Sequence, residues 1–130
     1  MNIKRFDHLV LTVSDVDRAV EFYTTVLDAT AERFDGDRRA VSFGEWKINF
    51  HPADDVYTPH AAVTSPGTDD FCLVVTEPID AVRERLEEHS VEIVHGPVKK
   101  TGAQGEMTSV YVRDPDENLV ELARYDGNVD

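Results

Sequence analysis

Two segments of this sequence combine chemically active side chains with the spacing of a β-strand. Glu121 lies between Val120 and Leu122 in the otherwise apolar segment 119–123. Burying an uncompensated carboxylate is costly, so it needs a metal ion or a cation as its partner. His51 follows Asn49 by two residues, and residues two apart in a strand point to the same face of a sheet. We therefore expect both segments to serve a polar site. An exposed histidine before Pro52 is the ordinary alternative for His51.

Ser109, Tyr111 and Arg113 alternate along another predicted strand. Their spacing places the three side chains on one face of a sheet, provided that no bulge intervenes. A half-buried tyrosine with a hydrated hydroxyl is the alternative for Tyr111. Cys72 lies in the apolar run 71–75, where we expect a reduced, buried and unreactive thiol rather than a nucleophile.

A locally basic segment precedes the strand of Ser109. Lys99 and Lys100 are followed by Gly102–Gly105, and we expect a mobile loop here. This segment predicts a lid in which Lys100 brings a positive charge to an anionic substrate. An ordinary exposed hairpin loop is the alternative.

The elements that would position these residues occur in two similar sets. Each set contains an apolar strand, an amphipathic helix and further short strands. Ser14 is the predicted cap of the first helix, and Pro78 suits the first turn of the second. The predicted strands are Phe6–Val13, Ala31–Phe34, Ala40–Phe43, Trp46–His51, Phe71–Val75, Val91–Val94, Thr108–Arg113 and Leu119–Arg124.

The two sets can be overlaid as an internal repeat. Segment 8–11 falls on 71–74, and segment 46–50 falls on 118–122. One helix and its strands cannot bury both faces of a sheet, so we expect an α+β fold in which two βαβββ modules curve around a shared, U-shaped cleft. The predicted organisation is one domain over 1–130, with module 1 at about 3–52, a linker at about 53–68 and module 2 at about 69–126.

Charge limits the expected partners. The net charge is −13, from 26 acidic and 13 basic side chains. Such a surface repels phosphate backbones and anionic lipid, so neither nucleic acid nor a membrane is an expected partner. Acid-rich, lysine-poor surfaces are typical of proteins from salt-loving organisms. The single cysteine allows no internal disulfide, and the N-terminus shows no apolar export signal, so we expect a cytoplasmic protein.

Three stretches resemble the vicinal oxygen chelate superfamily, which includes glyoxalases, bleomycin-resistance proteins and dioxygenases. They are DHLVLTVSDVDRAVEFYTTVL, KINFHP and GPVKKTGAQGEMTSVYVRDPDENLVELARY. The opening D-H-L-x-L-x-V-x-D and the closing D-P-D-x-N-x-x-E are specific when they occur together at this separation. The likeness covers essentially the whole chain and is nearest to the small glyoxalase-like branch. It implies the tandem βαβββ fold, often a divalent metal, and commonly a homodimer.

The resemblance also implies metal ligands on the first and last strands of each module. Carried over to this sequence, His8 is the first such position and Glu121 the last. Asn49 and Phe71 occupy the two positions between them. Here the chain departs from the pattern, because Phe71 has no lone pair and Asn49 offers only a weak carbonyl oxygen. His51 is a possible replacement on the same face as Asn49.

A set of His8, His51 and Glu121 would suit Zn, Ni, Mn, Co or Fe and would leave positions open for substrate oxygens. The ion would polarise two neighbouring oxygens and stabilise an enediolate. Glu121 is alternatively a proton-transfer base. The predicted substrate contacts are Asn49, Phe71, Ser109, Tyr111, Arg113 and Lys100.

The implied functions fall into different classes. The first is a metal-dependent, glyoxalase-like lyase or isomerase acting on a small oxygenated substrate. The second is a binding protein of the bleomycin-resistance type, which sequesters a hydrophobic or cationic compound without chemistry. An extradiol dioxygenase or a fosfomycin-type transferase is less favoured, because Phe71 stands at a position where those reactions need a ligand.

Overall fold

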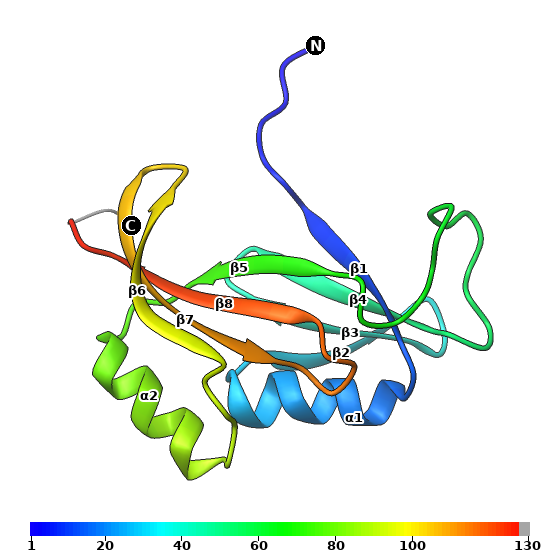
Figure 1. Cartoon of the computed structure of the whole chain (residues 1–130). Helices are drawn as coiled ribbons and strands as arrows, with labels where there is room; N and C mark the ends of the chain where they lie inside the picture. Colours follow the sequence, from blue (N-terminus) through cyan, green and yellow to red (C-terminus); the bar gives the residue numbers. More distant parts are fainter. Residues whose placement is uncertain (128–130) are drawn as a thin grey trace. The chain divides into compact units, whose positions relative to one another are not determined.

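The computed structural model describes residues 1–127, which form two compact units that divide between Thr68 and Asp69. Each unit has the order β-α-β-β-β and one four-stranded mixed sheet, so the predicted tandem α+β fold is confirmed. Figure 1 shows the elements of both units in chain order. Among the described residues, no helix is long and apolar enough to cross a membrane.

The first unit orders its strands β1-β4-β3-β2, with β1 parallel to β4 and the other neighbours antiparallel. All four predicted strands are present within a few residues of their predicted ends. The first strand begins at His8 and not at Phe6. The elements are β1 (His8–Val13), α1 (Val16–Glu21), the π-helical turn η1 (Phe22–Val26), β2 (Thr30–Phe34), β3 (Arg38–Phe43) and β4 (Trp46–Pro52).

The helix of this unit covers one face of its sheet. Asp15, rather than the predicted Ser14, is the N-cap, because its carboxylate accepts the Arg18 backbone N–H at 3.1 Å. α1 packs against β3 and β4 (Figure 1). The ring of Tyr23, at the end of this helical segment, lies 5.8 Å from that of Phe50. Alternation along the strands then turns His51 and its same-face neighbours away from α1.

The second unit orders its strands β5-β8-β7-β6, with β5 parallel to β8. Its helix contacts β7 and buries Val82 and Leu86. The elements are β5 (Asp70–Val74), α2 (Ile79–Glu88), β6 (His95–Gly102), β7 (Gly105–Arg113) and β8 (Leu119–Tyr125).

One predicted strand of this unit is wrong. Residues 91–94 form no strand, and β6 begins at His95. Lys99 and Lys100 therefore belong to a hydrogen-bonded strand paired with β7, and only a two-residue turn separates β6 from β7. This strand was not predicted because its sequence is rich in glycine and polar residues, which are not typical of strands. It is also an edge strand, paired only with β7.

The turn between β7 and β8 is held by Asp114. Its Oδ1 accepts the backbone N–H groups of Asp116 and Asn118 at 2.9 and 3.0 Å, and its Oδ2 accepts Asn118 Nδ2 at 2.8 Å. Asn118 Oδ1 in turn accepts the Asp69 N–H at 3.0 Å, which ties the turn to the start of β5. The D-P-D-x-N part of the closing motif is thus structural, and it fixes the register that sets Glu121 opposite its neighbours.

Candidate functional site

Four side chains with polar groups form one row across the second sheet. The strand register pairs Cys72 with Glu121, Glu121 with Tyr111, and Tyr111 with His95. Directly paired residues share a face of the sheet. This face is the one opposite Thr108 and Arg124, which line a surface cavity together with the start of α2. The row therefore lies on the face of this sheet away from the start of α2.

Glu121 and Tyr111 are the centre of this row. Partial burial, then the negative charge of Glu121 and a hydrogen bond to it, raise the pKa of Tyr111 to about 12. Tyr111 therefore stays protonated beside the carboxylate. Glu121 Oε2 is buried and has no hydrogen-bond partner. This oxygen of the carboxylate is left without a donor.

Cys72 corrects the prediction of a buried thiol, because it is exposed. Its reactivity is nevertheless low. Two effects raise the pKa of Cys72 to about 12. The larger is the partial loss of water around the sulfur, and the smaller is the negative charge of the neighbouring Glu121 carboxylate. Since the thiolate is the nucleophile, the prediction of an unreactive thiol agrees with this pKa.

The two lysines of the predicted lid lie on opposite faces of the sheet. Lys99 donates to Asp126 at 2.8 Å and to Thr108 at 2.9 Å, and these contacts hold it on the side of the sheet away from Tyr111. Lys100 Nζ lies 5.8 Å from the centre of the Tyr111 ring. Of the two, only Lys100 stands beside the row, and it does so from a strand and not from a loop.

Ser109 and Arg113 flank Tyr111 on β7, and the unbroken register from Met107 to Arg113 confirms that the three side chains share a face. Ser109 is fully buried, and its Oγ has no partner. Arg113 is exposed and donates to the backbone oxygen of Glu117 at 3.2 Å. Ser109 thus offers a free hydroxyl, whereas the contact of Arg113 is with the turn.

The overlay of His8 on Phe71 is wrong by one residue. His8 pairs with Lys47, two residues before Asn49, and the residue two before Glu121 pairs with Asp70. Asp70 is therefore the counterpart of His8. Phe71 pairs with Val120 and points to the opposite face from Glu121, so it does not lie on the predicted substrate face.

In the first unit, His8 is exposed at the start of β1. Its Nδ1 lies 2.9 Å from the Asp7 carboxylate. A carboxylate only accepts, so Nδ1 carries a proton, and in the neutral ring Nε2 keeps its lone pair. A histidine held in this way by a carboxylate is typical of metal ligands.

His51 is in a different state. It is only 5% exposed, and its Nε2 lies 3.2 Å from Arg38 Nη2. Burial, then the charges of Arg38 and His60, lower the pKa of His51. Because the guanidinium only donates, Nε2 is the acceptor and is not free for a metal ion. Asn49 shares this face and is also buried, and its Oδ1 has no partner.

These observations bear on the predicted metal site. Within residues 1–127, no group of three His, Cys, Asp or Glu side chains is arranged to hold a metal ion. Within these residues, neither unit by itself thus provides a full set of metal ligands. The binding of one ion by His8, His51 and Glu121 stays a prediction.

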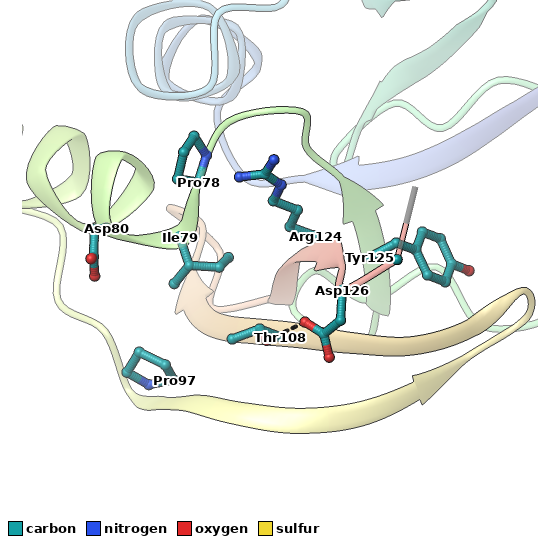
Figure 2. A pocket seen from close by; sticks show the side chains of 9 residues that line it. Pro78, Ile79, Asp80, Pro97, Thr108, Arg124, Tyr125 and Asp126 are labelled. Atoms are coloured by element: carbon teal, nitrogen blue, oxygen red, sulfur yellow. Dashed lines mark hydrogen bonds between the residues drawn. The ribbon is translucent and has the colours of Figure 1, made fainter. Parts of the chain in front are cut away.

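A surface cavity of about 390 Å³ lies elsewhere in the second unit. Figure 2 shows it between the start of α2 and the ends of β7 and β8, with Pro78, Ile79 and Arg124 around it. The dashed line joins Thr108 to Asp126, at 2.6 Å. None of the predicted site residues lines this cavity.

Sequence comparison agrees with this architecture. A family profile described as the Glyoxalase/Bleomycin resistance protein/Dioxygenase superfamily matches residues 5–122. The chain belongs to this superfamily. Its relatives include glyoxalase domain-containing protein RDO1 of Mycosarcoma maydis, which is 42% identical over 96% of this chain and 70% of its own length.

Two further relatives of this superfamily protein have been solved as structures. Virulence protein STM3117 of Salmonella typhimurium is 44% identical over 96% of this chain and 87% of its own length. Its crystal structure has a TM-score of 0.95 and covers 96% of this chain and 99% of that one. An integron cassette protein of V. Pseudocholerae, VPC_CASS1, is 42% identical with a TM-score of 0.95, and 98% of each chain is covered.

Sequence reasoning missed Arg38 and Tyr57, which surround His51. Arg38 lies 4.5 Å from the Tyr57 ring centre, and the rings of His51 and Tyr57 are 5.0 Å apart. The sequence nevertheless contained a signal that Arg38 lies opposite His51. The turn at Gly44 and Glu45 joins β3 to β4, and counting outward from this turn sets Arg38 opposite His51.

Proposed function

We propose that this protein is a glyoxalase-like enzyme of the lyase or isomerase type, in which Glu121 moves a proton on a small oxygenated substrate. The state of Glu121 carries this proposal. Its Oε2 is buried without a donor, and Tyr111 remains protonated beside it. A carboxylate oxygen without a protein donor has its lone pairs available to accept a proton from a bound substrate.

The proposed reaction is a proton transfer next to a carbonyl group. Oε2 takes the proton from the carbon beside the carbonyl, and the electron pair of that C–H bond forms the double bond of an enediolate. The electron pair of the carbonyl double bond moves onto its oxygen, which takes the proton of the neighbouring hydroxyl group. The same carboxylate oxygen returns its proton to the former carbonyl carbon, and the hydroxyl-bearing carbon becomes the new carbonyl, so no oxidant is needed. Tyr111, directly opposite Glu121 on β7, stays protonated beside the carboxylate throughout. A bound divalent ion would supply further stabilisation of the enediolate oxygens.

A binding protein without chemistry is the second candidate. The unpartnered polar atoms of Asn49 and His51 favour it, because such atoms suit a bound ligand as well as a reacting one. In that case Glu121 would contribute to affinity and not to turnover. The predicted dimer and the cytoplasmic location remain expectations under either candidate.

The test is proton exchange in D₂O, followed by ¹H NMR on a panel of α-hydroxy aldehydes, α-hydroxy ketones and hemithioacetals. The wild type is expected to catalyse loss of the C–H signal beside the carbonyl of at least one class. Glu121→Gln should slow this by about 10²–10⁴-fold, which is what general base catalysis contributes. Glu117→Gln, an exposed glutamate of the nearby turn, serves as the control. Saturable binding without exchange in the wild type would favour the second candidate.

Metal dependence is tested separately. Protein purified without chelator, and then reloaded with Ni²⁺, Mn²⁺ or Zn²⁺, is compared with His8→Ala, His51→Ala and Glu121→Ala for metal content. A metal enzyme predicts loss of bound ion in the His8 and Glu121 variants. Equal metal content in all four proteins removes the ion from the proposal and leaves the base intact.

A further inference from the structure

Arg38 has an unusual lack of acceptors. A guanidinium carries five N–H donors, and within residues 1–127 only one side-chain acceptor, His51 Nε2 at 3.2 Å, contacts Arg38. Arg38 Nε is buried and has no partner. No carboxylate of the described part of the chain pairs with Arg38, although 26 acidic residues are present in the sequence. A buried, unsatisfied charged donor is costly, which points to an acceptor supplied by a ligand.

The hydrogen bond to Arg38 fixes the proton on His51. Because Arg38 donates, Nε2 of His51 accepts, and a neutral ring then carries its proton on Nδ1. Its Nδ1 is buried and without a partner. Arg38 Nε and His51 Nδ1 are therefore both donors without an acceptor.

Aromatic rings lie close to the Arg38 guanidinium. Its carbon lies 4.5 Å from the centre of the Tyr57 ring and 5.3 Å from that of Phe34. Lys47 Nζ lies 3.8 Å from the Phe34 centre and adds a second positive charge to the same side. Contact with aromatic rings attracts the charge of a guanidinium but does not replace an acceptor for its N–H groups.

We propose that Arg38 and His51 form a binding subsite for a carboxylate group of a small molecule. Two orphan donors require an acceptor, and the positive charge of Arg38 requires an anion. A planar carboxylate matches the edge of a guanidinium with two oxygens. The subsite does not depend on the chemistry proposed for Glu121. This subsite and the predicted metal site at His51 are alternatives, since the guanidinium repels a cation.

The test uses sodium succinate and inorganic phosphate as probes, at constant ionic strength in chloride. NMR follows the Arg38 Nε–H and His51 Nδ1–H signals and yields a Kd. Succinate is expected to shift both signals saturably. Arg38→Gln should weaken binding at least about tenfold, the loss expected for one charge-assisted hydrogen bond. Arg33→Gln, which removes the same charge from an exposed position of β2, should leave Kd unchanged.

Arg38→Lys guards against loss of folding, because it keeps the charge but removes the Nε–H and the fork. It should also weaken succinate, with an unfolding midpoint close to that of the wild type. Glu121→Gln should bind succinate like the wild type, which separates this subsite from the proposed proton transfer. Absence of a saturable shift, equal weakening by Arg33→Gln, or tighter binding of phosphate than of succinate would each overturn the carboxylate subsite.

Discussion

Glu121 and Tyr111 face each other across β8 and β7, and the phenol of Tyr111 is held protonated beside a carboxylate that has one free, buried oxygen. Neither residue alone would provide both a protonated phenol and a free carboxylate oxygen. The tyrosine lies opposite the carboxylate and keeps its proton, and burial removes water from Oε2 of Glu121. Together they leave an accepting site with no protein donor.

The first prediction concerns the pKa of Tyr111. Its value of about 12 depends in part on the charge of Glu121, so Glu121→Gln should move it toward the ordinary value near 10. NMR titration of the ring carbon that bears the hydroxyl would measure this. The same titration of Glu117→Gln should match the wild type, and an unchanged Tyr111 in Glu121→Gln would show that the two groups do not interact.

The second prediction concerns Cys72. A pKa of about 12 leaves about one thiol in 10,000 ionised at pH 8, so alkylation by iodoacetamide should be slow although the residue is exposed. Glu121→Gln removes a charge that opposes the thiolate and should therefore speed the reaction. The rate is followed by mass spectrometry over a range of pH. Wild-type Cys72 that reacts as fast as free cysteine at pH 8 would contradict this account.

The third prediction concerns the turn between β7 and β8. Asn118 is fully buried, and its side chain bonds both Asp114 and the Asp69 backbone. Asn118→Ala leaves these partners unsatisfied and should lower the free energy of unfolding by about 1–3 kcal/mol. Urea denaturation measures the change. Asn2→Ala, at an exposed position, should have no effect, and equal stability of the two variants would show that the turn is not held by Asn118.

The fourth prediction concerns pH and His51. Its pKa in the folded protein is lowered, so the unfolded chain, with an ordinary pKa near 6.5, takes up a proton more readily. This contribution to stability is fully present above pH 6.5 and decreases as the pH falls from there toward the lowered pKa. Urea denaturation at a series of pH values should show this slope. His51→Phe should flatten it, whereas His89→Phe should retain it.

The sequence predicted the repeat, most strands and the shared face of Ser109 and Tyr111, because strand alternation and turn residues are local signals. It did not predict the state of His51, which depends on Arg38, a residue thirteen positions earlier. The one-residue error at Phe71 has a similar cause. Two apolar strands can be overlaid in either phase, and only hydrogen-bonded pairing with β8 decides which side chain shares a face with Glu121.

The account depends most directly on the role of the Glu121 carboxylate. The decisive measurement compares wild type and Glu121→Gln in two assays on the same preparations: C–H exchange into D₂O with the most reactive substrate of the panel, and succinate binding at Arg38. The account predicts exchange reduced by about 10²–10⁴-fold with binding unchanged. Exchange at the wild-type rate in Glu121→Gln would contradict it.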